Sequence, residues 1–351
     1  MESISILGIG IISKIGNTID AIWENLERGI VSNNTVCCSF DSGLSATKKR
    51  KANRYSEMGI YVSKEALKDS SINIEMYDKN RIGTIFTTGY GPINSSLTFA
   101  KSIAEGDWEY CSPTVFANSV NNACVGHICM ELKIRGASTM LMASNNFLYS
   151  QLLLTSKKAD YIITGSIEEH CAELFNALQK SEFASDLVFN EAAVAFLIGN
   201  GKHKNAYCIV EQIEECNIGN YPIINKVNET YVISQLEKMY QKVIKDNEID
   251  VFLGSENGTY FDVIEKTVLQ KVLPDGTIHI ENTKAFFGET LGSSFNVNVM
   301  VAALCLRKGK LPHGYYGENI RVQSVLVSGY DLSGNYSVAR LRNGGNYEKI
   351  L

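Results

Sequence analysis

Short apolar runs and longer amphipathic segments alternate along the chain. Runs such as Ser3–Leu7 and Ala192–Ile198 are rich in apolar and β-branched residues, which is typical of buried strands. In segments such as Ile19–Glu27 and Arg54–Lys68, apolar residues recur at helical spacing, which predicts helices with one buried face. Strands that alternate with helices in this way predict an α/β fold.

The alternation of strands and helices occurs twice along the chain. In the first half, further strands are expected at Arg81–Thr87, Thr139–Met142 and Tyr161–Thr164, and a further helix at Asn122–Lys133. In the second half, strands are expected at Cys208–Gln212, Val251–Gly254, Thr277–Ile280, Ser324–Ser328 and Ser337–Leu341, and helices at Ser234–Lys245, Asp262–Leu273 and Leu291–Arg307. We therefore expect two similar halves, residues 1–200 and 206–351.

The segment Gly199–Asn205 separates these halves. It is polar and rich in glycine, as a connection between two folded units should be. Only five prolines occur in the chain, so long irregular linkers are not expected. The two halves should therefore pack tightly against each other.

Composition and charge describe an ordinary globular protein. Of the 351 residues, 45% are apolar and 20% are charged, and the net charge of −5 argues against a broad nucleic-acid surface. There is one local basic cluster, which consists of Lys48, Lys49, Arg50, Lys51 and Arg54. The first residues lack the basic region and cleavage site of a secretory signal, and no apolar run approaches the roughly 20 residues of a membrane span. We expect a cytoplasmic protein that binds neither nucleic acid nor membrane.

The nine cysteines are scattered and include no CxxC pair, which favours reduced thiols over a disulfide framework. Cys124, His127 and Cys129 lie close enough in sequence to suggest metal ligands, but no second ligand pair follows at a suitable spacing. Cys124 also lies in an apolar helical stripe with Ile128 and Leu132, which favours a buried structural thiol over a nucleophile activated by His127. We expect no metal site.

The stretch Gly8-Ile-Gly-Ile-Ile-Ser13 follows a strand and therefore looks like a dinucleotide fingerprint. The loop after it is expected to continue to Asn17, where a true fingerprint would already have begun a helix. No acidic residue ends a second strand at the required distance either. We expect no bound nucleotide cofactor.

A series of landmarks in a fixed order resembles the β-ketoacyl synthases of the thiolase-like superfamily. The landmarks are Ile6–Gly16 with Trp23–Gly29, Arg81–Thr84 with Thr88–Gly89, Ser112–Ser119, Gly126–Ile128, Arg135–Gly136, Gly165–Ser166 with Glu168, Asn190–Ala193, Asn257–Thr259 with Asp262 and Glu265, Lys284 with Gly288, and Gly329–Tyr330 with Gly334–Asn335. Each landmark is weak alone, but their order and spacing together are specific. The resemblance implies a thiolase-like α/β fold, with two related βαβ-type halves packed as an αβαβα layered sandwich.

The same resemblance locates the catalytic positions of the family in this sequence. The nucleophilic cysteine of active members falls on Asn145, and their two catalytic histidines fall on Asn257 and Glu289. An amide cannot form an acyl thioester. A glutamate beside the malonyl carboxylate would repel it by about 1 to 4 kcal/mol at contact distance. The family's lysine is retained as Lys284, which could form a buried ion pair with Glu289, an ordinary surface salt bridge, or no contact with it.

A retained scaffold with replaced catalytic residues resembles the chain-length factors, which are silent ketosynthase homologues of type II polyketide systems. This sequence departs from them in having Asn145 where a glutamine is often found. The resemblance implies a heterodimer with an active ketosynthase, in which this chain shapes the acyl channel. It also implies substrates carried on the phosphopantetheine arm of an acyl carrier protein. The apolar strand Ser138–Ala143 is the expected contact between subunits.

Other functions remain open at this point. The chain could be an acyl-thioester enzyme, either a malonyl decarboxylase that uses Asn145 as an amide donor or an acyltransferase that uses Cys124. It could also be a homodimeric acyl-binding protein. The basic cluster from Lys48 to Arg54 could receive an acidic carrier protein, or it could simply be a solvated helix face.

Overall fold

The computed structural model describes residues 3–31, 34–106, 109, 111–245, 248–256, 258–280, 283–316 and 320–344. In this part of the chain the strands form one ten-stranded mixed sheet in the order β3-β2-β4-β5-β1-β6-β10-β9-β7-β8. The strands are β1 (Ile4–Ile12), β2 (Ile82–Thr88), β3 (Ser138–Met142), β4 (Tyr161–Glu168), β5 (Ala192–Asn200), β6 (Cys208–Asn217), β7 (Val251–Leu253), β8 (Ile278–Ile280), β9 (Ser324–Tyr330) and β10 (Asn335–Arg342).

The strand order repeats from one half of the chain to the other. In the first half, β5 lies antiparallel to β1 and β4, whereas β2 lies parallel to β4 and β3. In the second half, β10 lies antiparallel to β6 and β9, whereas β7 lies parallel to β9 and β8. The two sets of strands meet where Ile4–Ile6 of β1 pair with Cys208–Val210 of β6.

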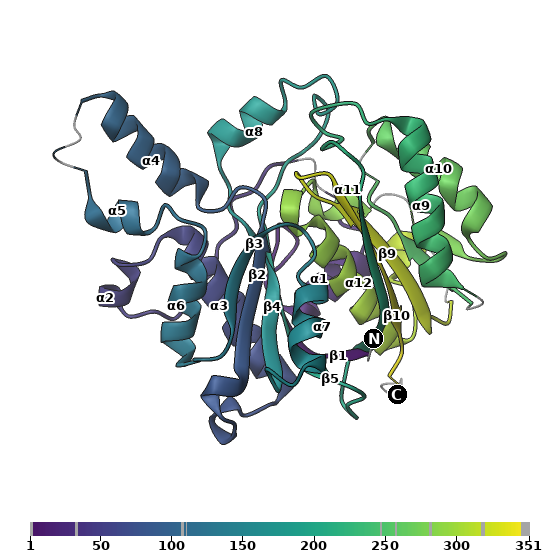
Figure 1. Ribbon diagram of the computed structural model, residues 1–351, viewed down its shortest axis with the longest axis horizontal. Coiled ribbons are helices and arrows are strands. Elements are labelled where there is room, and N and C mark those ends of the chain that lie inside the picture. The colour runs from purple at the N-terminus through teal and green to yellow at the C-terminus, as the bar shows by residue number, and fades with distance from the viewer. Residues whose placement is uncertain are drawn as a thin grey trace.

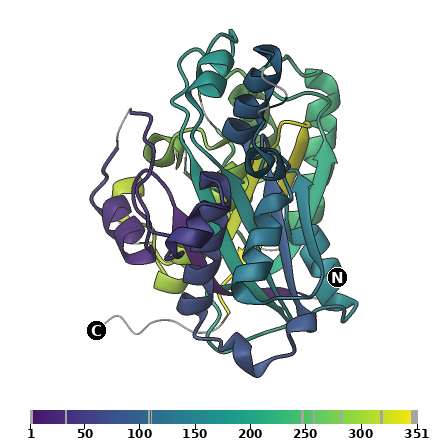
Figure 2. The ribbon, with the colours of Figure 1, turned by 90° about the vertical axis from the view of Figure 1, so that its left-hand side faces the viewer.

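Helices lie on both outer faces of the strands and between the two sets. The helices of the described residues are α1 (Ile19–Glu27), α2 (Ala46–Lys49), α3 (Arg54–Ser70), α4 (Ile93–Ala104), α5 (Pro113–Ala117), α6 (Ala123–Leu132), α7 (Phe147–Thr155), α8 (Ala172–Leu178), α9 (Glu229–Ile244), α10 (Phe261–Val272), α11 (Thr283–Phe287), α12 (Ser294–Lys308) and α13 (His313–Tyr316). Three short 3-10 helices, η1 (Ile74–Met76), η2 (Lys79–Arg81) and η4 (Leu291–Ser293), accompany them. In Figure 1, α3 and α6 lie on the left and α9 and α10 on the right, and Figure 2 turns the left-hand side toward the viewer.

Three apolar cores correspond to this layered arrangement. One core joins α3 and α6 to the first set of strands, and another joins α9 and α10 to the second set. The third core lies between the two sets and contains residues of both, together with α7 and α12. The αβαβα arrangement expected from the sequence is therefore confirmed.

Helix α12 runs through the third core and is buried from Ser294 to Leu306. Polar side chains on such a buried helix need hydrogen-bond partners within the protein. The Asn298 side-chain amide donates to the carbonyl oxygens of Gly254 (2.8 Å) and Ser328 (3.1 Å). The helix ends at Gly309, whose left-handed φ of 69° suits glycine. The buried amide ties α12 to the ends of β7 and β9.

The structure corrects the interpretation of the Gly8–Ser13 stretch. Strand β1 continues to Ile12, where a loop was expected, because the whole segment is buried and paired with β5. The stretch contains glycines because α3 crosses β1 closely: a Cβ atom at Gly8 or Gly10 would overlap backbone carbonyl oxygens of α3. These glycines serve helix–strand packing.

Helices α4, α7 and α8 were not expected from the sequence. Helix α4 has no buried residue, so it contributes no side chain to the apolar cores. In Figure 1, α4 and α5 project at the upper left, away from the central layers. Among the described residues, no helix is both long and apolar enough to cross a membrane.

Candidate functional site

Asn145 lies immediately before α7, at the point where the chain leaves β3. Its side chain is 5% exposed, and its Oδ1 accepts hydrogen bonds from the backbone amides of Phe147 (3.0 Å) and Leu148 (3.4 Å). These amides have no partner within the helix, so the side chain caps the N-terminus of α7. The Asn145 Nδ2 atom is buried and has no partner at ordinary hydrogen-bond distance, but the side chain lies near the Glu215 carboxyl and lowers the pKa of that group against the effect of burial. The residue expected at the nucleophile position therefore holds the helix start.

The turn between β3 and α7 is attached to the second half of the chain through Ser144. The Ser144 amide donates to the Asp331 carboxylate (3.2 Å), and the Ser144 carbonyl accepts from the Asn296 amide of α12 (3.0 Å). Burial raises the pKa of Asp331, although several backbone amides oppose that rise. The Ser144 hydroxyl is buried and has no partner, so no base is positioned to activate it.

Glu289 lies just before η4 and α12. Its carboxylate accepts from the Leu291 amide (2.7 Å) and the Ser294 hydroxyl (2.8 Å) and forms an ion pair with Lys284. The side chains of Lys284 and Glu289 are only 12% and 2% exposed, and the ammonium also lies 5.6 Å from the centre of the Tyr330 ring. Of the arrangements that the sequence left open, the structure shows the buried ion pair. Through these interactions, the Glu289 carboxylate fixes the segment that leads into α12.

A second buried carboxyl group, that of Glu168 at the end of β4, lies near this pair. It accepts hydrogen bonds from the backbone amides of Gly89 and Tyr90 and from the Thr88 hydroxyl (3.4 Å). Burial nevertheless raises its pKa to about 8. Burial, together with the carboxylates of Glu168 and Glu289, raises the pKa of Tyr90 to about 12. The surroundings of Glu289 are therefore acidic, and the sequence pattern gave no indication that Tyr90 belongs to them.

Asn257, which the resemblance assigns to the third catalytic position, lies outside the described residues. The helix that follows it carries Glu265, whose carboxylate accepts from the hydroxyls of Ser255 (3.0 Å), Ser328 (2.8 Å) and Tyr336. Glu265 is fully buried, and this burial raises its pKa to about 7. This network connects β7, α10, β9 and β10.

Three of the five cations in the basic cluster are already neutralised. Lys48 pairs with Glu131 (2.6 Å), Lys49 pairs with Asp41 (2.9 Å), and Arg54 pairs with the fully buried Glu191 carboxylate. Arg50 and Lys51 have no carboxylate partner among the described residues. The cluster is therefore less positive at its surface than the sequence alone suggests.

The structure places Cys124 deep in the core between α3 and α6. Its side chain is fully buried, and its Sγ contacts the Tyr55 carbonyl oxygen at 3.8 Å. Burial raises the pKa of the thiol, which disfavours the nucleophilic thiolate. His127, by contrast, hydrogen-bonds Asn118 (3.0 Å) rather than the thiol. This arrangement argues against an acyltransferase that uses Cys124.

Comparisons with known proteins agree with this geometry. The family profile described as "Beta-ketoacyl synthase, N-terminal domain" matches residues 31–202. The chain is 19% identical to 3-oxoacyl-[acyl-carrier-protein] synthase 2 of Staphylococcus aureus over 358 aligned positions, which cover 87% of this chain and 88% of that protein.

Two solved structures have nearly the same backbone. The ishigamide ketosynthase/chain length factor matches with a TM-score of 0.81 and 15% identity, over 97% of this chain and 99% of that chain. AntDE:AntF, a type II PKS acyl-carrier protein in complex with its ketosynthase, matches with a TM-score of 0.78 and 16% identity, again over 97% and 99%. At these identities the structural matches establish the fold.

Proposed function

We propose that this chain is a member of the thiolase-like β-ketoacyl synthase superfamily and a catalytically silent subunit of the chain-length-factor kind; the family profile match over residues 31–202 and the shared fold support this. In this role it pairs with an active ketosynthase during polyketide or fatty-acid-type chain elongation and shapes the acyl channel. The observation that carries the proposal is the buried ion pair between Lys284 and Glu289.

Condensation requires a nucleophile and neutral donors that receive the developing negative charge. At the nucleophile position, Asn145 has no ionisable atom, and its oxygen is already used by the amides that start α7. At one histidine position, Glu289 brings a carboxylate whose acceptors are used by Lys284, Leu291 and Ser294. A malonyl carboxylate placed there would meet the Glu289 carboxylate, so binding of the extender unit is opposed.

The β3 edge, which we define as strand β3 with the outward side of α7, supports a subunit contact. Strand β3 is the last strand of the sheet that the described residues form, and no other described strand pairs with its outer side. Apolar side chains are exposed on this edge: Met142 is 51%, Tyr149 38% and Leu152 56% exposed. An exposed apolar edge of this kind suits a second sheet that continues the first. We propose the active ketosynthase as the occupant.

In this proposal, the substrate is carried on the phosphopantetheine arm of an acyl carrier protein. The carrier protein delivers this arm to the active site of the ketosynthase partner. Of the basic cluster, Arg50 and Lys51 are the cations that remain available to an acidic carrier, because Lys48, Lys49 and Arg54 already pair with carboxylates. Docking of the carrier on this subunit would therefore depend on Arg50 and Lys51.

A decarboxylase is the second candidate, and one observation favours it. The Asn145 Nδ2 donor lies at the position expected for the nucleophile, where it could turn from the nearby Glu215 carboxyl to stabilise the enolate oxygen of a decarboxylating malonyl thioester. The carboxylate of Glu289 opposes this reaction for the reason given above. The test measures carbon dioxide released from a malonyl-carrier protein, after subtraction of thioester hydrolysis. Release by the wild type that is absent in an Asn145→Ala variant would establish this function instead.

Co-expression with a ketosynthase from the same gene cluster tests the leading proposal. A stable heterodimer is expected by size-exclusion chromatography with light scattering, and intact mass should show acyl groups on the ketosynthase and none on this chain. Met142→Lys on the β3 edge should dissociate the pair, whereas Met76→Lys, at a position 80% exposed on η1, should not. An isolated monomer in the co-expression, or an acyl adduct on this chain, would contradict the proposal; a homodimer would favour the acyl-binding alternative.

We also propose that residues 1–200 and 206–351 are two related halves. The matching order and direction of β1–β5 and β6–β10 support this division. The cytoplasmic location expected from the sequence remains a prediction.

A further inference from the structure

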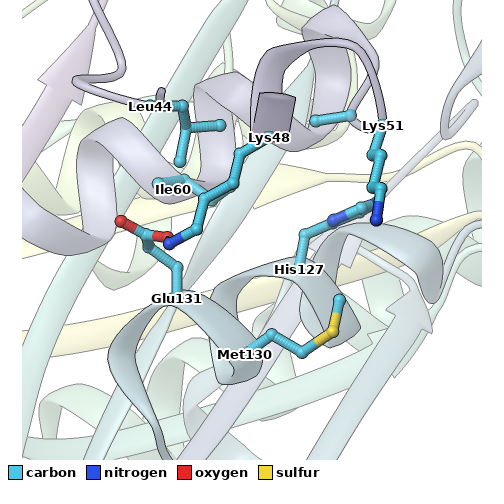
Figure 3. Close-up of a pocket in the computed structure, with 8 residues that line it drawn as sticks. Leu44, Lys48, Lys51, Ile60, His127, Met130 and Glu131 are labelled. Atoms are coloured by element: carbon cyan, nitrogen blue, oxygen red, sulfur yellow. The ribbon is translucent and has the colours of Figure 1, made fainter. Parts of the chain in front are cut away.

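A pocket of about 220 Å³ opens between the α2–α3 segment and α6 (Figure 3). Its walls include four apolar side chains, those of Leu44, Ala52, Ile60 and Met130. Leu44 and Ile60 are buried, whereas Met130 is 69% exposed at the rim. At about 30 Å³ per water molecule, the pocket has room for roughly seven waters, or for a small organic molecule. None of its lining residues belongs to the site around Asn145 and Glu289.

On one side of the pocket, the charges compensate one another. The Glu131 carboxylate is held by Lys48 (2.6 Å) and Lys64 (2.8 Å), and these two hydrogen bonds lower its pKa. Glu131 is therefore ionised and already paired at neutral pH. It contributes no free negative charge that would repel an anion from the pocket.

On the other side, the charge is uncompensated. The ammonium group of Lys51 has no carboxylate partner among the described residues, and Figure 3 shows its side chain and that of His127 pointing toward one another. With Lys48 and Lys64 sharing the single charge of Glu131, the pocket and its rim have a surplus of positive charge. A ligand with one negative charge would be attracted to the Lys51 side.

Hydrogen bonding fixes the tautomer of His127. The Asn118 Nδ2 atom donates to the carbonyl oxygens of Lys51 (2.8 Å) and Thr114 (3.0 Å), so its Oδ1 must be the acceptor toward His127 Nε2 (3.0 Å). Nε2 therefore carries the hydrogen. Burial lowers the pKa of His127 and favours the neutral ring, which leaves Nδ1 as an acceptor. The pocket thus combines an ammonium donor, a neutral imidazole and an apolar wall.

We propose that this pocket is a binding site for a small amphipathic carboxylate, with the carboxylate on Lys51 and the acyl or aryl body against Leu44, Ala52, Ile60 and Met130. A single free ammonium suits one negative charge, whereas a phosphate group calls for several converging donors. Because a cavity of about 150 Å³ accommodates benzene, a pocket of about 220 Å³ suits a ligand of about eight or nine heavy atoms. The site goes beyond the proposed pairing with a ketosynthase and does not depend on it.

Calorimetry and NMR on the full chain test this site, with hexanoate and benzoate as probes and the neutral hexanamide as comparator. We expect hexanoate to bind with a dissociation constant of about 1 mM, which is ordinary for a ligand of this size. It should shift the imidazole resonance of His127. Lys51→Met should weaken binding about tenfold, because the charged hydrogen bond is lost.

The matched control is Lys49→Met, which removes a neighbouring lysine that pairs with Asp41 outside the pocket. It should leave hexanoate affinity unchanged. Met130→Ala, at an exposed position that the fold tolerates, should weaken hexanoate and benzoate by shortening the apolar wall. Three results would overturn the proposal: hexanamide binding as tightly as hexanoate, equal losses in Lys51→Met and Lys49→Met, or no effect of hexanoate on the His127 resonance.

Discussion

The ion pair between Lys284 and Glu289 should be energetically coupled, and a double-mutant cycle measures that coupling. The two side chains are 12% and 2% exposed, so neither charge can be hydrated by bulk water if its partner is removed. Glu289→Gln keeps an acceptor for the Leu291 amide but leaves the Lys284 ammonium with little besides the Tyr330 ring. Lys284→Met leaves the Glu289 carboxylate with its two remaining donors.

Each single change should therefore lower the free energy of unfolding by about 3 kcal/mol, the cost of an unpaired buried charge. The double variant removes both charges, so its loss should be no larger than that of either single variant. The resulting coupling energy is about 3 kcal/mol, at the upper end of the range for residues in direct contact.

Guanidinium unfolding at pH 7, followed by tryptophan fluorescence and by circular dichroism, gives the required free energies if the two transitions coincide. The exposed pair Lys49 and Asp41 provides a control cycle, Lys49→Met with Asp41→Asn, in which no resolvable coupling is expected. Additive losses at Lys284 and Glu289 would refute the reasoning, because they would mean that the two charges do not stabilise each other in the folded protein.

Three further predictions concern stability. Asn145→Ala should lower the free energy of unfolding by about 1 kcal/mol through loss of the α7 cap, whereas Asn145→Ser, which keeps an uncharged acceptor, should lower it less; equal melting temperatures for Asn145→Ala and wild type would contradict the capping role. The pKa of Glu168 is raised to about 8 in the folded protein, so the folded state binds the proton more tightly than the unfolded state, and stability should fall as pH rises from about 5 to 8. Glu168→Gln should flatten that part of the pH profile of the melting temperature, and an unchanged slope would show that the carboxyl titrates normally. Gly10→Ala should lower the free energy of unfolding by several kcal/mol, because its Cβ would overlap the Val62 carbonyl oxygen. The control Gly126→Ala lies within α6, where a Cβ meets nothing within 4 Å, and it should be neutral or stabilising. Similar melting temperatures for the two variants would exclude close packing of α3 on β1.

The sequence by itself determined the class of the fold and most of its elements. Buried strands such as β5 and amphipathic helices such as α3 follow from local patterns of apolar residues. The spacing of apolar residues within a short segment indicates both the type of element and its buried face. The ion pair between Lys284 and Glu289 was also among the arrangements that the sequence allowed, since five positions separate the two residues and one short turn brings them together. The assignment of Asn145, Asn257 and Glu289 to the family's catalytic positions rests on the order of the landmarks and stays a prediction.

Only the tertiary structure decided which partner each polar group has. Arg54 meets Glu191 across 137 positions of sequence, and Lys48 meets Glu131 across 83, so a run of cations that reads as a free basic surface is largely neutralised. The contact of Asn296 with Ser144 spans 152 positions and attaches the start of α7 to the second half of the chain. Local propensity cannot encode such pairs, because they depend on how the sheet orders its strands. The desolvation that raises the pKa of Glu168 has the same origin, since it depends on how closely distant segments of the chain pack around that carboxyl.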